Sequence, residues 1–262
     1  MNEQWRKHYE QLTFTDDYLF KRIMQNSEIC KRVLEVLLGK KITSIVSLET
    51  EKEATLEFFA HGVRFDVYIE GRDEAIDLEM QTYHEADLVN RIRRNHTQLD
   101  LLTMSKNNTV GVSKATCVIF ICTFDPFNRG RPVYSFSWRD DEEPSFTLGD
   151  KSRRIVYNAP AWESCEDKEL GAFLCYVATQ QTRSKLATDL DNVVAFAKHS
   201  TSWRMGYDMI YEAIAQAKDE GIAIGIHDTR IDTAKRALEC GIPVDTVSKF
   251  TGLSIEEVEA LQ

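Results

Sequence analysis

The chain lacks the features that mark secreted and membrane proteins. It contains no run of about 18 apolar residues, which a membrane-spanning helix needs, and its first residues include no apolar segment typical of a secretory signal. Its six cysteines form no C-x-x-C pair, and no histidine accompanies them at the spacing of a zinc site. We therefore expect a cytoplasmic protein without membrane partners, in which the cysteines are reduced and mostly buried.

An excess of positive charge is also missing. The formal net charge is -10 at pH 7, which argues against indiscriminate binding to nucleic acid. Residues 85–131 are an exception, because they hold seven Lys or Arg against four Asp or Glu. This stretch predicts a local basic surface on an otherwise acidic protein.

Two short segments with alternating apolar and polar residues, Val63–Ile69 and Ala75–Gln81, are the most informative part of the chain. A period of two is typical of half-buried strands, and the polar, glycine-containing segment between them predicts a hairpin. The pairing register follows from matching the apolar residues of the two strands. This matching places Phe65 opposite Met80, Val67 opposite Leu78 and Ile69 opposite Ile76.

The same register brings two acidic residues together on the polar face of the hairpin. Asp66 falls opposite Glu79, roughly 5 Å away, with Gln81 next along the strand. Like charges in this position are destabilising, and a bound divalent metal is the best reason to keep them. In the alternative interpretation both carboxylates are solvated, and Arg64 and Asp77 on the same face adjust the local charge.

These residues carry a resemblance to a known family. Asp66 followed by Glu79-Met80-Gln81 resembles the D…E-x-Q core of the Rpn group (recombination-promoting nuclease / putative transposase) of the PD-(D/E)XK nuclease superfamily. Three further segments agree with that group in order and spacing, and the similarity extends over most of the chain. These segments are Thr15–Lys21, Arg91–Arg93 and Val118–Asp125.

The resemblance implies an α/β fold with a restriction-endonuclease-like core, in which helices flank a central mixed sheet in the order α-β-β-β-α-β. The patterns along the chain predict the same order: a helix over 16–38, the hairpin strands, a helix over 86–104 and a buried strand over 115–124. Helical patterns then dominate. We expect a nuclease-like domain with a helical extension over 1–225 and a small helical tail over 226–262.

Hydrolysis of a phosphodiester needs an activated water and relief of charge on the phosphoryl oxygens, which Mg²⁺ or Mn²⁺ supplies. Such ions prefer oxygen ligands, so Asp66, Glu79 and the backbone carbonyl of Met80 are the expected set. Gln81 stands where the wider superfamily usually has lysine. Its amide can orient water or phosphate but cannot act as a base, so the water-activating group is unassigned.

Basic residues beside the expected site are candidates for contacts with phosphate. Arg91 and Arg94 lie one helical turn apart, and the resemblance adds Arg93 as part of an R-x-R pair. Near the start of the chain, the resemblance implies that Asp17 faces the active site and that Lys21 accompanies it. The alternatives are a solvated helix face for the arginines and a simple i, i+4 pair for Asp17 and Lys21.

The tail predicts short helices, with Ser254 capping the last one and Glu257 completing a capping box. Its spacing is compatible with a helix-turn-helix unit, but its last helix is acidic and would repel phosphate. We therefore favour a protein-contact role, including a homo-oligomer. Five apolar residues would then pack against the main domain or a second subunit: Ile231, Leu238, Val247, Leu253 and Val258.

Together these observations and the resemblance predict a metal-dependent DNA endonuclease of the recombination-promoting nuclease or transposase-like type. The alternative is a catalytically inactive protein that binds DNA or a partner and retains the nuclease fold.

Overall fold

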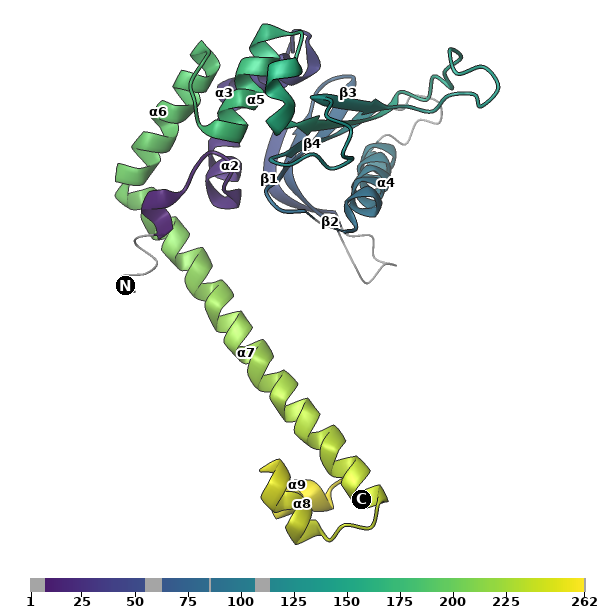
Figure 1. Cartoon of the computed structure of the whole chain (residues 1–262), viewed down its shortest axis with the longest axis vertical. Coiled ribbons are helices and arrows are strands. Elements are labelled where there is room, and N and C mark those ends of the chain that lie inside the picture. Colours follow the sequence, from purple (N-terminus) through teal and green to yellow (C-terminus); the bar gives the residue numbers. More distant parts are fainter. Residues whose placement is uncertain (1–7, 55–62, 85, 107–113, 262) are drawn as a thin grey trace. The chain divides into compact units, whose positions relative to one another are not determined.

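A computed structural model describes residues 8–54, 63–84, 86–106 and 114–261 (Figure 1). The chain divides into two compact units, one ending at Ser200 and the other beginning at Thr201. The boundary expected after residue 225 falls inside the helix α7 (Thr201–Glu239), because the small residues around it continue the helix.

The first unit is built on a six-stranded mixed sheet with the strand order β1-β2-β3-β4-β6-β5. The first three strands are antiparallel neighbours, β3, β4 and β6 run parallel, and β5 pairs antiparallel with β6 at the edge. The expected α/β class, with a central mixed sheet, flanking helices and a helical C-terminal region, is therefore confirmed. The strands are β1 (Ser47–Ala54), β2 (Val63–Glu70), β3 (Glu74–Gln81), β4 (Ala115–Cys122), β5 (Val133–Phe136) and β6 (Ser152–Asn158).

Two of the three apolar pairs predicted for the hairpin are confirmed, and the ladder ends before the third, Phe65 with Met80. Val67 pairs with Leu78 and Ile69 with Ile76. The side chains of all four are buried because they lie on a covered face of the sheet.

Helices flank both faces of the sheet (Figure 1). On one face, α4 (Leu88–Lys106) packs its apolar residues, including Leu99, against residues such as Phe120 and Val156. On the other face, the Tyr157 hydroxyl of β6 donates a hydrogen bond to the carbonyl of Leu37. The helices outside α4 in this unit are α2 (Asp17–Met24), α3 (Ser27–Leu38), α5 (Lys168–Thr179), α6 (Lys185–His199) and the short 3-10 helix Ala159–Ser164.

The helix expected over 16–38 is two helices, α2 and α3. The side chain of Asn26 accepts hydrogen bonds from the amides of Glu28 and Ile29, so it caps a new helix where a continuous one was expected. Ser27 is the first residue of α3. The second helix ends at Gly39, whose φ of 62° suits glycine.

The second unit contains α7, α8 (Val244–Thr251) and α9 (Ile255–Glu259). The expected capping box of Ser254 and Glu257 is present. The tail forms its own small core, in which Val247, Leu253 and Val258 are buried and Ile231 and Leu238 pack against them. These five residues therefore need no outside partner, contrary to expectation. Among the described helices, none is both long and apolar enough to cross a membrane.

Candidate metal centre

The ladder between β2 and β3 opens where Asp66 and Glu79 face each other. Backbone pairing runs as far as Val67 and Leu78, and the next pair in register is held by side chains instead. The Asp66 amide donates to Glu79 Oε1 at 3.0 Å, and the Met80 amide donates to Asp66 Oδ2 at 3.2 Å. Each carboxylate therefore takes the place of a carbonyl acceptor on the opposite strand.

The two carboxylates and their neighbours on β3 are buried rather than solvated. Asp66 is 7% exposed, and Glu79 is fully buried together with Asp77. Gln81 is also buried. We call Asp66, Asp77, Glu79 and Gln81 together the acidic row. Burial of several acidic groups in one row is costly unless cations or protons offset the charge.

Lys21 supplies one of the offsetting charges. From α2, its Nζ lies 3.4 Å from Asp66 Oδ1, 2.7 Å from Asp17 Oδ1 and 3.4 Å from Glu51 Oε1. Asp17 is itself exposed and contacts the row through Lys21. The i, i+4 pair noted in the sequence therefore exists, and it extends to Asp66.

Arg91 supplies the second offsetting charge. From α4, its Nη2 donates to Glu79 Oε2 at 2.7 Å and its Nη1 donates to Gln81 Oε1 at 3.3 Å. Arg93 and Arg94 are exposed on the same helix, and neither forms an ion pair with a carboxylate of the described residues. The structure thus separates Arg91, which faces the acidic row, from the two neighbouring arginines.

Three further residues belong to this centre, and we did not assign them to the site from the sequence. The Asn95 side chain donates to Asp77 Oδ2 at 2.8 Å, while Asp77 Oδ1 has no partner among the described residues. Glu51 of β1 reaches Lys21 and has a φ of 55°, an uncommon value for a residue with a side chain. The sequence contains a signal for Asp77 and Asn95, since Asp77 shares the face of Glu79 and Asn95 lies one helical turn from Arg91.

Burial and mutual repulsion shift the pKa values of this row. Burial raises the pKa of Glu79 to about 7, and the charge of Asp66 adds to the shift while Arg91 opposes it. The pKa of Asp66 is raised mainly by burial despite the nearby Lys21. The pKa of Asp77 is raised well above its usual range by burial and by the charge of Glu79. Without a further cation, the row therefore favours holding a proton over carrying its full negative charge.

These shifts predict a pH dependence of the metal-free stability. Because Glu79 binds its proton more tightly in the folded than in the unfolded chain, the free energy of unfolding should fall as pH rises from about 4.5 to 7. Glu79→Gln should remove this contribution, on the order of 1.4 kcal/mol for each unit of pKa shift. Urea unfolding near pH 5 and pH 8 measures the effect. Glu53→Gln on exposed β1 is the matched control, and equal pH slopes in wild type and Glu79→Gln would contradict the assignment.

The donor set fits a hard divalent cation in its chemistry. Asp66 and Glu79 offer carboxylate oxygens beside the Met80 backbone, and a bound cation would stabilise the ionised carboxylates that burial disfavours. Within the described residues, however, no group of three or more His, Cys, Asp or Glu is placed to hold a metal ion. Lys21 lies 3.4 Å from Asp66 Oδ1 and Arg91 lies 2.7 Å from Glu79 Oε2, so these cations contact oxygens that a metal would use.

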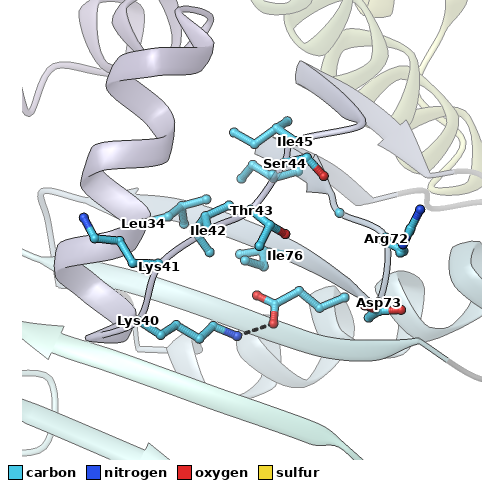
Figure 2. A pocket seen from close by; sticks show the side chains of 13 residues that line it. Leu34, Lys40, Lys41, Ile42, Thr43, Ser44, Ile45, Arg72, Asp73 and Ile76 are labelled. Atoms are coloured by element: carbon cyan, nitrogen blue, oxygen red, sulfur yellow. Dashed lines mark hydrogen bonds and ion pairs between the residues drawn. The ribbon is translucent and has the colours of Figure 1, made fainter.

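A small cavity lies away from this centre, at the opposite end of the hairpin. It has a volume of about 130 Å³ and lies beside the turn that contains Gly71 and Arg72 (Figure 2). Lys40 forms an ion pair with Glu74 at its edge. No residue of the acidic row lines this cavity.

Comparisons of this chain with protein-family models, with curated proteins and with solved structures find no match. The function is therefore argued from the centre itself.

Proposed function

We propose that this protein is a metal-dependent endonuclease that hydrolyses phosphodiester bonds of DNA at Asp66, Glu79 and Gln81 of the acidic row. The observation that carries the proposal is the buried pair of facing carboxylates at the point where the β2–β3 ladder opens. A purely structural role explains this pair poorly, because two apolar residues would close the ladder without an electrostatic cost.

Asp66, Glu79 and the Met80 carbonyl would hold Mg²⁺ or Mn²⁺, which supplies an activated water and stabilises charge on the phosphate. Lys21 and Arg91 neutralise the carboxylates before the ion binds, and both can then turn to phosphate oxygens. Gln81 Oε1 accepts from Arg91, so its Nε2 is the group that can donate to water or phosphate.

The topology supports assignment to the restriction-endonuclease-like class. From α3 to β4 the elements follow the order α-β-β-β-α-β, with an antiparallel β1-β2-β3 meander and a parallel β4. The candidate residues lie on the second and third strands of this meander and on the helix that follows. This placement is the basis for proposing membership of the Rpn group, together with the segments that resemble it.

DNA is the proposed partner because exposed basic residues lie close to the acidic row in the chain. Arg93 and Arg94 follow Arg91 on α4 and are exposed. We also propose a cytoplasmic location, since all six thiols are free, as in a reducing compartment.

Nicking of supercoiled plasmid by purified protein tests the function. We expect nicked and linear products with Mg²⁺ or Mn²⁺ and none with EDTA. Absence of cleavage with either ion, by protein shown to be folded, would contradict the proposal.

One observation favours a second candidate, a DNA-binding or partner-binding protein without turnover. Lys21 and Arg91 pair with both carboxylates, which would allow the fold to persist without a metal. Plasmid binding without metal-dependent nicking would identify this alternative.

We also propose that the protein self-associates, through α7 rather than through the tail. Ile210, Ile214 and Ile224 are exposed on α7, and with Ala217 and Gly221 they follow the alternating three- and four-residue spacing of a coiled-coil seam. This spacing is self-complementary, so a second copy of the helix is the expected occupant.

Ile214→Glu should therefore convert a dimer into a monomer, because it places like charges in the seam. Light scattering measures the mass. Glu212→Gln, also exposed on α7, is the control. A wild-type protein that is already monomeric would contradict the proposal.

A further inference from the structure

A second site lies on the α4 side of the sheet, near the edge formed by β5 and β6. It is a cavity of about 530 Å³ whose wall includes Phe127, Phe136 and Trp138 together with Arg93 and Arg154. No described acidic residue lines it. We call this site the aromatic cavity.

Two of its aromatic residues, Phe127 and Phe136, hold each other by ring contacts, and Phe136 and Trp138 leave ring surface open. Phe127 packs edge-on against Tyr134 at 4.9 Å and against Phe136 at 5.6 Å between ring centroids. Phe136 remains 43% exposed and Trp138 58% exposed. Exposed aromatic rings that are fixed by neighbours are suited to stacking against a flat ligand.

The two arginines add positive charge to this aromatic surface. Arg154 is the direct cross-strand partner of Phe136, and its guanidinium carbon lies 6.0 Å from the centroid of the Trp138 ring. Neither Arg154 nor Arg93 forms an ion pair with a carboxylate of the described residues. The cavity therefore matches a ligand that has both a flat aromatic part and a negative charge.

We infer that the aromatic cavity binds an unpaired nucleotide of the DNA, with the base stacked on Trp138 or Phe136 and the phosphate held by Arg93 and Arg154. A volume of about 530 Å³ lies within the usual range of small-molecule sites and accommodates one base with its sugar. An apolar peptide would use the rings but would leave the two guanidinium groups without a partner.

The helix α4 links this cavity to the acidic row. Arg91 contacts Glu79, while Arg93, two residues later and therefore on a different side of the helix, lines the aromatic cavity. The first turns of α4 thus lie between the two sites, and a single strand that crosses them would reach both. This inference rests on the proposed function for its ligand, and it adds that the favoured substrate contains unpaired nucleotides beside the cleaved bond.

Fluorescence anisotropy with labelled single-stranded DNA tests the inference, in EDTA so that cleavage is absent. A matched oligonucleotide with abasic sugars in place of nucleotides keeps the phosphates and removes the bases. We expect wild type to prefer the complete oligonucleotide, and Trp138→Ala to weaken its binding about tenfold and abolish the preference. Arg154→Gln should weaken both oligonucleotides alike and lower the salt slope by about one.

Phe146→Ala is the matched control, because Phe146 is exposed nearby in the chain but does not line the cavity. Equal binding of both oligonucleotides by wild type, or an unchanged affinity in Trp138→Ala, would overturn the inference, as would tighter binding of an apolar peptide that competes with DNA. Plasmid nicking separates this inference from the proposed function. Plasmid cleavage without a preference for the complete oligonucleotide refutes only base binding in the aromatic cavity. A preference for the complete oligonucleotide without plasmid cleavage refutes only the proposed nuclease activity.

Discussion

Asp66→Asn should reduce metal-dependent plasmid nicking at least about a hundredfold, because even residues that only support metal ligands contribute 10–100-fold. The substitution keeps an oxygen that can accept the hydrogen bond from the Met80 amide. It also removes one of two repelling carboxylates, while Lys21 keeps Asp17 and Glu51 as partners. The metal-free protein should therefore stay folded and, above pH 7, be as stable as wild type or more stable.

Initial nicking rates and urea unfolding on the same preparations give both halves of this result. Glu53→Gln, exposed on β1, is the control for a lost carboxylate outside the row. Nicking by Asp66→Asn at the wild-type rate would show that the catalytic site lies elsewhere. Loss of both activity and folding would show that Asp66 is needed for the fold and would not support a catalytic role.

Arg91→Met should destabilise the metal-free protein by about 1.4 kcal/mol more near pH 8 than near pH 5, because protonating a carboxyl one pH unit above its pKa of about 7 costs about that much. Removing one partner of a buried ion pair leaves the other charge uncompensated. Glu79 is fully buried, and Arg91 is the charge that lowers its pKa. At low pH the carboxyl is protonated and needs no cation, so the cost of losing Arg91 is confined to the higher pH.

Urea unfolding at the two pH values measures this difference, and Arg94→Met on the same helix is the matched control, expected within about 0.5 kcal/mol of wild type. Mg²⁺ should stabilise Arg91→Met more than it stabilises wild type, because the ion no longer competes with a guanidinium. A loss of stability that is the same at both pH values would mean that Arg91 acts through packing rather than through Glu79.

The sequence was sufficient to predict the hairpin and the facing of Asp66 and Glu79. Both follow from a strict period of two, which leaves one register that buries Val67, Ile69, Ile76 and Leu78 together. The α/β class followed from the same periodicities. The break between α2 and α3 was not foreseen, because the apolar pattern continues through it and only the Asn26 side chain decides that a new helix starts there.

The remainder of the centre depends on contacts that no local pattern reports. Lys21 and Glu51 meet Asp66 only through the packing of α2 beside β1 and β2. The pairing of Asp77 with Asn95 likewise depends on how α4 lies on the sheet. The expected packing of the tail's apolar residues against the main domain or a second subunit was wrong for the same reason, since apolar residues that look exposed along single helices bury one another.

Calorimetric titration with Mn²⁺ tests the central claim most directly, because it asks whether the acidic row holds a metal without relying on activity. We predict saturable binding by wild type that strengthens from pH 6 to pH 8, as Glu79 loses its proton, and that is lost in the double variant Asp66→Asn, Glu79→Gln. Binding of equal strength in wild type and the double variant, or no binding by folded wild type, would contradict the account.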